Sequence, residues 1–488
     1  MKKAIIIGSG IAGIACALRL NHKGYKVTVL EANENFGGKI QEFNQNGFRW
    51  DMGPSLFTLP YLIDELFVLY GEEPKNHFNY HRKETICNYF WNDGSSFSVN
   101  SNSCRFINEA SKFFNEDPEK LGDYLINSQK KYDLTADLFI EKSLHKASTF
   151  LNKKAVKAVS NIKALDTNLS LNELNEKHFS NPKLIQFFNR FATYNGSSPY
   201  KTPGIMSMIP HLEMNLGTYY PKNGMRSIVN SLVQFGLNKG IEFIAKKKVK
   251  SIKLTGKKVK GVRTEHDFYD ADLVISNADI YPTYKNLLPN LKMPKAVKKE
   301  EKSSSGIIFY WGVKKSFPQL DLHNVFFTEN YREEFEQIFA NKGFNTDPTI
   351  YLNISSKEEK QDAPDGCENW FVMINTPNNL GQNWEETRMK LRETVINKLN
   401  KVLGCNLEDL IVVEDYLDPI LIEQRTSSHL GALYGAASNS KFAAFLRHPN
   451  FKSNINGLYF CGGSVHPGGG IPLCLNSAKI VANQVAAA

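Results

Sequence analysis

The sequence predicts an α/β fold, because glycine-rich turns follow apolar strand patterns near both ends of the chain. A β-branched run at residues 3–7 leads into a turn with three glycines, then into a helical pattern and a second strand. Near the C-terminus, a strand pattern at residues 458–461 leads into a second glycine-rich loop, followed by a helix expected from about residue 475. This order is typical of a mostly parallel sheet with helices on its faces.

The composition is that of a folded globular chain. Its 488 residues are 42% hydrophobic and 22% charged, with a formal net charge of +9, which excludes intrinsic disorder and a collagen-like chain. The longest mostly apolar stretch, residues 4–18, is shorter than the roughly 18–20 residues of a membrane-spanning helix. Seven scattered cysteines without a C-x-x-C pair indicate reduced thiols in the cytoplasm and no metal site.

The first glycine turn is a dinucleotide-binding motif of the form G-x-G-x-x-G. Its glycines allow a tight turn, a close approach of the backbone to a pyrophosphate at the helix N-terminus, and close helix–strand packing. Glu31 ends the second strand 18 residues beyond the last glycine, where a carboxylate accepts ribose hydroxyls, and Ala32 follows it. This motif alone fits either NAD or FAD. The turn residues expected at the cofactor are Gly8, Gly10, Ile11, Ala12 and Gly13.

The next motifs favour FAD. Phe36-Gly37-Gly38-Lys39 places paired glycines and a cation after Glu31, and a sharp turn follows at residues 48–54. This succession resembles the flavoprotein superfamily of amine oxidases and carotenoid desaturases, in which it holds FAD. The family usually has Arg after the paired glycines, and Lys39 keeps the charge without the bidentate fork. The resemblance implies further FAD contacts at Gly38, Lys39, Gly53, Pro54 and Ser55.

The C-terminal loop, residues 462–473, contains five glycines and two prolines. It resembles the flavin-contacting motif G-A-G-T-H-P-G-A-G-I-P of bacterial-type phytoene desaturases. The resemblance places Gly463 and Ser464 near the phosphates or ribityl chain, and three residues against the isoalloxazine. Those three residues are Gly470, Ile471 and Pro472. His466 is the candidate catalytic acid or base at the flavin, with a structural role in the loop as the alternative.

Inner segments resemble the same family. Residues 219–225 resemble its Y-Y-P-x-G-G-M junction, before a helix expected at residues 226–239. Residues 272–279 resemble its A-D-x-V-I-S-N-A-D strand, which ends in a polar turn, and Asn277 there is an expected FAD contact. Val249 stands where relatives hold adenine through backbone atoms. The resemblance implies a Rossmann-type FAD-binding domain of the amine-oxidase/GDI-like superfamily, with an interleaved α+β substrate domain. The predicted FAD domain comprises residues 1–74, 219–290 and 415–488, and the substrate domain residues 75–218 and 291–414.

The substrate domain shows both strand and helix patterns. Strand character, rich in Phe, Tyr and Ile, is expected in five segments, and helical periodicity in two. The strands are expected at residues 89–99, 307–313, 324–328, 349–354 and 370–375, and the helices at residues 121–164 and 385–403.

Two basic segments carry the positive charge. Residues 140–165 show an apolar stripe opposite lysines, which predicts a helix packed on its own domain or lying on an anionic membrane. Residues 246–260 hold eight lysines that alternate with apolar residues, which favours the solvated face of a β-hairpin over membrane or phosphate contact. No nucleic-acid motif accompanies them, so we expect a peripheral membrane contact and no nucleic-acid partner.

The resemblance implies an FAD-dependent carotenoid desaturase. The sequence of the C-terminal motif, residues 462–473, is similar to that of 1-hydroxycarotenoid 3,4-desaturases. A long, acyclic, apolar carotenoid would give a hydride to the flavin and a proton from the adjacent carbon, so no catalytic triad is expected. Glu213, His211 and Asp51 could accept the proton only if the fold brings them inward. Without a second G-x-G-x-x-G, electrons must leave to oxygen, a quinone or another acceptor.

Several alternatives remain open at this point. They are a phytoene desaturase, a redox-neutral carotenoid isomerase that leaves the product mass unchanged, and a colourless prenyl-binding escort protein of the GDI type. A soluble amine oxidase is disfavoured, because its last motif usually carries an acidic residue where Ser464 stands.

Overall fold

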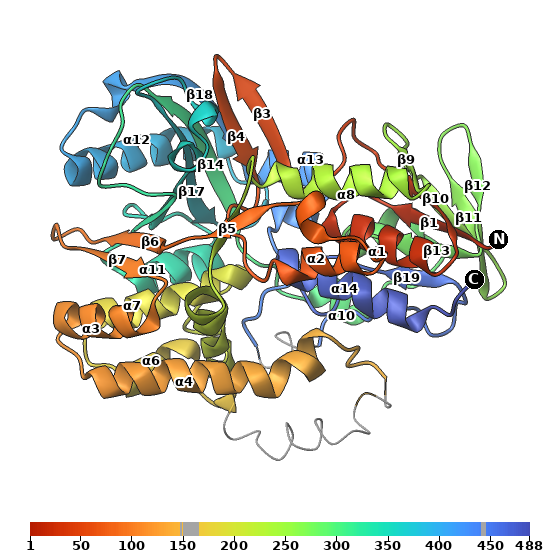
Figure 1. Cartoon of the computed structure of the whole chain (residues 1–488), viewed down its shortest axis with the longest axis horizontal. Coiled ribbons are helices and arrows are strands. Elements are labelled where there is room, and N and C mark those ends of the chain that lie inside the picture. Colours follow the sequence, from red (N-terminus) through yellow and green to blue (C-terminus); the bar gives the residue numbers. More distant parts are fainter. Residues whose placement is uncertain (147–148, 150–164, 441–445) are drawn as a thin grey trace.

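The structure is a computed structural model of the chain, and it describes residues 1–146, 149, 165–440 and 446–488. Figure 1 shows two lobes, with both chain ends in the lobe that carries the first glycine motif. The basic amphipathic segment predicted at residues 140–165 lies largely outside the described residues.

A five-stranded parallel sheet forms the centre of the first lobe, in the order β19-β13-β1-β2-β9. Its strands come from widely separated parts of the chain: β1 (Lys3–Ile7), β2 (Lys26–Leu30), β9 (Glu242–Ile244), β13 (Leu273–Ser276) and β19 (Leu458–Phe460). Apolar side chains of β1 and β2 pack on one face against four helices, which close the larger core. These helices are α1 (Ile11–His22), α2 (Tyr61–Val68), α8 (Arg226–Asn238) and α14 (Ile471–Gln484).

The opposite face of this sheet is covered by a small antiparallel sheet of β10 (Ser251–Thr255), β11 (Lys258–Arg263) and β12 (Phe268–Asp270). This is the lysine-rich hairpin, and its apolar residues Ile252 and Val259 are buried, whereas most of its lysines are exposed. Lys246 and Lys247 form ion pairs with Glu34 and Asp267. The predicted hairpin with one exposed, lysine-bearing face is therefore confirmed, and its preference for solvent over membrane or phosphate stays a prediction.

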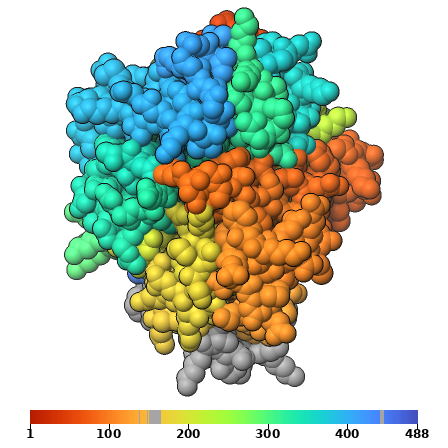
Figure 2. Space-filling model, turned by 90° about the vertical axis from the view of Figure 1, so that its left-hand side faces the viewer, coloured from red at the N-terminus to blue at the C-terminus, as the bar shows by residue number. Residues whose placement is uncertain are grey.

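The second lobe is built on a seven-stranded mixed sheet, in the order β18-β14-β17-β16-β15-β6-β7. Helix α12 (Trp384–Leu403) covers one face, and a helical layer packs beside the edge of β6 and β7. Figure 2 shows the outer side of this lobe, where distant segments lie together. The strands are β6 (Thr85–Phe90), β7 (Ser96–Asn100), β14 (Ser305–Val313), β15 (His323–Phe326), β16 (Ile350–Ile354), β17 (Glu368–Thr376) and β18 (Ile411–Leu417).

Two predictions in this lobe are wrong. Residues 89–99 are not one strand, because a turn at Gly94, with φ of +85°, separates β6 from β7. The helix predicted at residues 121–164 is interrupted, because α4 gives way after Thr135 to a π-helical turn, Ala136–Ile140, and bends and turns follow at residues 141–145. Where the helix type changes, the Thr135 hydroxyl donates to the Lys131 carbonyl oxygen at 2.6 Å. Such a bond competes with regular helix hydrogen bonding. The helices of this layer are α3 (Ser103–Phe114), α4 (Pro118–Thr135), α6 (Leu171–His178), α7 (Pro182–Asn189) and α11 (Tyr331–Glu336).

Two antiparallel ribbons lie between the lobes. They pair β3 (Gln41–Gln45) with β4 (Phe48–Met52), and β5 (Tyr80–Arg82) with β8 (Tyr219–Pro221). Strands of the two main sheets alternate along the chain, and the domain boundaries given above stay a prediction. The remaining short helices are α9 (Ile280–Pro282), α10 (Lys295–Lys299) and α13 (Pro419–Thr426).

Candidate cofactor site

The first glycine motif forms the turn between β1 and α1. Gly8 has φ of +91°, and its N–H donates to the Leu30 carbonyl oxygen at 2.9 Å. A Cβ at Gly13 would lie 2.3 Å from the Gly8 carbonyl oxygen, so only glycine lets the helix pack this closely on the strand. Gly10 is the N-cap of α1 and provides no side-chain cap. The amides of Ile11 and Ala12 therefore open an uncapped helix N-terminus.

Asn277 connects this motif to the last strand of the sheet. Its side-chain oxygen accepts from the Gly13 N–H at 3.1 Å, and its amide nitrogen donates to the Cys461 carbonyl oxygen at 3.2 Å. A Cβ at Gly10 would lie 2.8 Å from the same side-chain oxygen. The structure thus brings Asn277 to the first motif and shows it bridging residues far apart in the chain, while its contact with FAD stays a prediction.

Glu31 lies at the end of β2 beside the glycine turn. One carboxylate oxygen accepts from the Ser9 N–H at 2.9 Å and the Ser9 hydroxyl at 2.6 Å, and the other from the Asn33 N–H at 2.9 Å. Ala32 is exposed next to it. Val249 is buried in the cluster behind β1 and β2, on the other side of the sheet from α1.

The paired glycines pack directly on the first motif. The Gly37 N–H donates to the Ser9 carbonyl oxygen at 2.9 Å, and a Cβ at Gly38 would lie 3.1 Å from the Gly10 Cα. A Cβ at Gly53 would lie 2.1 Å from the Lys39 carbonyl oxygen, so the third motif packs on the second. These two close approaches require glycine at positions 38 and 53.

Lys39 points from the paired glycines toward the C-terminal part of the chain. Its ammonium group donates to the carbonyl oxygens of Leu433 at 2.6 Å and Ala432 at 3.2 Å. Burial lowers the pKa of Lys39. Pro54 and Ser55 follow on the same side, and the Ser55 hydroxyl lies 2.7 Å from the Tyr351 hydroxyl of the second lobe.

The C-terminal loop is held by close backbone contacts. A Cβ at Gly463 would lie 3.1 Å from the Gly469 Cα, and the Ser464 hydroxyl accepts from the Ile280 N–H at 2.9 Å. At Gly470, with φ of +102°, a Cβ would meet no atom within 4 Å. Helix α14 begins directly after it, at Ile471, so the expected start near residue 475 is wrong.

The earlier start of α14 has a local reason. Pro472 stands in the first turn, where a missing N–H and a fixed φ favour helix initiation. Gly470 contributes no side-chain cap, so a second open helix N-terminus lies in the lobe that carries the first motif.

His466 is buried, and its contacts join the loop to other segments. Its Nε2 lies 2.8 Å from the Lys142 carbonyl oxygen, and its ring centre lies 5.8 Å from that of His145. Its backbone carbonyl oxygen accepts from the Asn450 amide at 2.7 Å. These contacts support a structural role, and the catalytic role of His466 stays a prediction.

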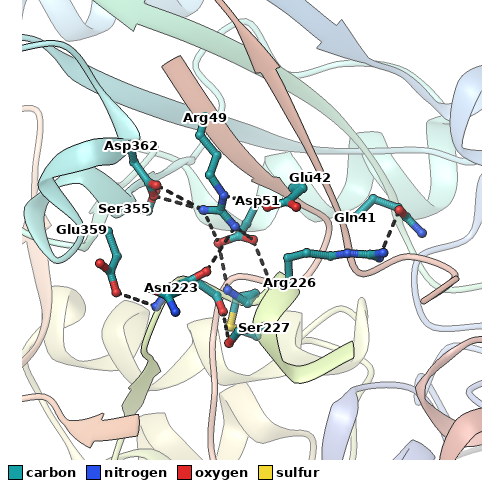
Figure 3. Close-up of polar contacts among 12 residues, drawn as sticks. Gln41, Glu42, Arg49, Asp51, Asn223, Arg226, Ser227, Ser355, Glu359 and Asp362 are labelled. Carbon is teal, nitrogen blue, oxygen red and sulfur yellow. Dashed lines mark hydrogen bonds and ion pairs between the residues drawn. The ribbon is translucent and has the colours of Figure 1, made fainter. Parts of the chain in front are cut away.

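A charge cluster, not anticipated as a unit from the sequence, joins the β3–β4 ribbon to the second lobe (Figure 3). The Arg49 guanidinium contacts Glu42 at 2.7 Å, Asp51 at 2.8 Å and Asp362 at 3.2 Å. Its members come from the β3–β4 ribbon and from the second lobe. The D-x-G-P motif could have indicated Asp51 as a member of the cluster. No local motif indicates Asp362, which lies more than 300 residues away in the chain.

Asp51 also caps a helix. Its carboxylate accepts from the backbone N–H groups of Met225 at 2.9 Å and Arg226 at 3.0 Å, at the start of α8. The Arg226 side chain donates to the carbonyl oxygens of Phe36 and Ile40, on either side of the paired glycines. The cluster therefore fixes the paired-glycine loop to α8 and to the second lobe.

All three suggested proton acceptors have partners within the protein. Asp51 pairs with Arg49, and Glu213 pairs with Arg190 at 2.8 Å. Burial raises the pKa of both carboxyl groups and lowers the pKa of His211, whose Nδ1 lies 2.9 Å from the Asn215 amide. These contacts favour structural roles for the three side chains.

The residues present fit a flavin dinucleotide. Glycines remove side chains where three loops meet, and Gly10 and Gly470 add no side-chain cap at the N-termini of α1 and α14, where free N–H groups attract anions. Lys39 adds a partly buried cation. Over the described ranges, no cluster of side chains is suited to a metal ion. In the same part of the chain, no helix is long and apolar enough to cross a membrane.

Comparisons with known proteins point to one family. Residues 11–486 match the family described as flavin containing amine oxidoreductase. A 1-hydroxycarotenoid 3,4-desaturase from a Flavobacterium species is 56% identical over 485 residues, covering 99% of each chain. A 4,4'-diaponeurosporene oxygenase from Staphylococcus aureus is 32% identical, covering 99% of this chain and 98% of the other.

Solved structures show the same fold at low identity. An oxidoreductase from Methanosarcina mazei aligns with a TM-score of 0.65 at 17% identity, covering 99% of this chain and 100% of the other. A Rab GDI from Plasmodium falciparum aligns with a TM-score of 0.54 at 14% identity, covering 99% of this chain and 98% of the other.

Proposed function

Because the chain belongs to the family of flavin-containing amine oxidoreductases, we propose that it desaturates an acyclic carotenoid that carries a hydroxyl group at one end, at the 3,4-position. The observation that carries this proposal is the 56% identity, over nearly the full length of both chains, to a 1-hydroxycarotenoid 3,4-desaturase. The chain is an FAD-dependent oxidoreductase, which excludes a colourless escort protein as its main function.

The protein's part in this reaction is to bind and orient. Bound FAD supplies the oxidant, which takes two electrons and a hydrogen from an allylic carbon. The uncapped N-terminus of α1 would hold the pyrophosphate, and Glu31 the ribose hydroxyls. Gly470, whose Cβ position is open, leaves room for the flat ring at the start of α14.

A buried apolar cluster lies where the ribbon meets the second sheet. Tyr310 and Phe371 from β14 and β17 belong to it with Trp50 of the ribbon, and Phe43, Tyr351 and Leu433 pack against it. We place the polyene beside this cluster, where apolar contacts would orient a hydrocarbon. Asp51 and Glu213 are neutralised by arginines, so we expect the proton from the adjacent carbon to leave to water rather than to either carboxylate.

Product analysis tests the proposal. Purified protein loaded with FAD is incubated with acyclic carotenoids of the same chain length, with and without a 1-hydroxyl group. The hydroxylated substrate should lose two hydrogens and absorb at longer wavelength, while the unhydroxylated one reacts more slowly. Conversion of phytoene alone would contradict the proposal, and a product of unchanged mass would indicate isomerisation.

A second candidate is carotenoid oxygenation, which the 32% identical 4,4'-diaponeurosporene oxygenase favours. The same product analysis separates the two activities, since oxygenation adds oxygen to the molecule and desaturation does not. The higher identity to the desaturase is why we place desaturation first.

We also propose that the protein meets its substrate at a membrane surface in the cytoplasm. The support is the substrate class together with the local positive charge of residues 140–163 in the sequence. In a flotation assay, the protein should float with anionic vesicles more than with neutral ones. Equal partitioning, or none, would contradict this.

The electron acceptor needs a separate experiment. Anaerobic reoxidation of the reduced protein with a quinone, compared with reoxidation by oxygen, identifies it.

A further inference from the structure

Arg447 is a buried cation that the proposed reaction does not yet use. Only 4% of its surface is exposed. Its guanidinium makes two long contacts, to the Tyr434 carbonyl oxygen and to the Ser438 hydroxyl, each at 3.3 Å. Its Nε is buried and has no hydrogen-bond partner among the residues that the structure describes. A guanidinium with five donors is seldom left this poorly satisfied.

Arg447 also has no carboxylate partner in the described part of the chain. Glu300 acts on its pKa through space, but the Glu300 carboxylate pairs with Lys302 at 2.6 Å. Residues 147–148, 150–164 and 441–445, which are not described, contain no Asp or Glu. Burial lowers the pKa of Arg447 to about 10, so the side chain is still charged at neutral pH. An unpaired buried charge is unfavourable unless something compensates it.

The guanidinium lies directly behind the C-terminal glycine loop. A Cβ at Gly468 would be 3.0 Å from the Arg447 Nε. Two residues later, Gly470 opens α14 without a side-chain cap. Lys39 is also near, because its ammonium group donates to the Leu433 carbonyl oxygen and Arg447 donates to the carbonyl oxygen of the next residue, Tyr434. A buried cation, a partly buried cation and the positive end of a helix therefore converge at the place where we expect the flavin ring.

We propose that Arg447 stabilises the negative charge that the flavin gains on reduction, and so raises the reduction potential of the bound FAD. In the reaction, an allylic C–H bond of the carotenoid breaks, and its hydrogen and electron pair pass to the oxidised flavin. The flavin gains one negative charge, and the adjacent carbon of the substrate loses a proton to water. A fixed and buried cation favours the charged, reduced state more than the neutral, oxidised one.

The inference rests on FAD binding within the proposed function and is independent of the carotenoid that is used. The test is an anaerobic reductive titration against reference dyes, with no carotenoid present. Arg447→Gln should shift the reduction equilibrium at least about tenfold toward the oxidised flavin, or roughly 30 mV for two electrons. Arg447→Lys, which keeps the charge, should have a reduction potential close to that of the wild type.

A second pair of variants neutralises the charge without removing the arginine. Ser438→Asp places a carboxylate beside the guanidinium and should lower the reduction potential, as Arg447→Gln does. Ser438→Asn, whose side chain has the shape of aspartate without its charge, should not lower it. Lys390→Gln removes a charge from the exposed surface of α12 and should leave the potential unchanged.

The opposite results would overturn the proposal. One is a wild-type potential in Arg447→Gln with FAD bound. If that variant does not hold FAD, the decisive result is a wild-type potential in Ser438→Asp. The proposal also fails if Arg447→Lys lowers the reduction potential of the bound FAD as much as Arg447→Gln does. Packing of the arginine, rather than its charge, would then set the potential. Failure of carotenoid conversion would leave these measurements unaffected.

Discussion

Asp51 neutralises Arg49 and caps the start of α8, so one carboxylate serves two elements. Asp51→Ala leaves two helix N–H groups and part of the guanidinium without an acceptor. We expect the free energy of unfolding to fall by about 3 kcal/mol, as for other broken buried pairs, measured by urea denaturation of the FAD-loaded protein.

The matched control for this variant is Glu109→Ala, which removes a carboxylate from the exposed ion pair with Arg105. Its urea midpoint should stay close to that of the wild type. Equal midpoints for Asp51→Ala and the wild type would show that the cluster in Figure 3 does not stabilise the fold.

Asp362 should make stability depend on pH. Burial raises its pKa to about 6, against the opposing contacts with Ser355 and Arg49, whereas an unfolded aspartate has a pKa near 4. The folded chain holds this proton over a range where the unfolded chain has released it, so the contribution to stability falls as pH rises from about 4 to 6. Asp362→Asn should remove this fall, which amounts to at most about 1.4 kcal/mol per pH unit.

Urea midpoints measured at several pH values between 4 and 6.5 would show the difference. Asp365→Asn, at an exposed position in the same loop, should keep the wild-type dependence. If Asp362→Asn follows the wild-type curve, the carboxyl group is not held protonated by burial.

The packing role that the motif predicts for Gly13 is confirmed, because a Cβ there would lie 2.3 Å from the Gly8 carbonyl oxygen. The structure also brings Gly38 and Asn277 to this turn, while the FAD contacts of all three residues stay a prediction. Arg447 and Asp362 could not be found in this way. Their surroundings come from segments far away in the chain, and no local spacing encodes them.

At the scale of elements, the contact between β1 and α1 depends on Gly13. Gly13→Ala would place a methyl group 2.3 Å from the Gly8 carbonyl oxygen, so the helix must move away from the strand. We expect about 1–3 kcal/mol of destabilisation and loss of most bound flavin, measured as the ratio of flavin to protein absorbance after purification.

Gly122→Ala is the matched control, because it lies inside α4, where a Cβ would meet only the Ile107 side chain, at 3.9 Å. It should stabilise the protein by about 0.5–1 kcal/mol and leave the flavin content unchanged. A normal flavin content in Gly13→Ala would show that the turn tolerates a side chain.

Element boundaries followed from sequence where the pattern was clear, as for α12 and β16. They were wrong where tertiary contacts or turn chemistry decided the outcome. Asp93 and Gly94 turn the chain between β6 and β7, inside a run whose composition indicates a single strand. The start of α14 was placed too late, since the glycine loop leads into the helix without an intervening cap.

At the scale of the whole molecule, FAD should stabilise the fold strongly. Its predicted contacts come from all three segments that build the parallel sheet, and a ligand that binds only the folded state adds stability with concentration. At about 100 times its dissociation constant, FAD should add roughly 2.7 kcal/mol. Thermal unfolding of the flavin-free protein over a series of FAD concentrations measures this.

Riboflavin is the control ligand, because it lacks the diphosphate that the uncapped N-terminus of α1 would hold. It should raise the melting temperature much less than FAD. A melting temperature independent of FAD would contradict a binding site shared between the three segments.

The order of β1, β13 and β19 in the sheet also bears on how the chain is made. On the ribosome, β13 is complete about 180 residues before β19 is synthesised, which is a delay of roughly 10–35 s at ordinary elongation rates. During that interval one edge of an apolar parallel strand has no neighbour, and exposed edges of this kind recruit other chains. Newly made protein should therefore need protection from aggregation until its last strand emerges, and FAD can be retained only after synthesis is complete.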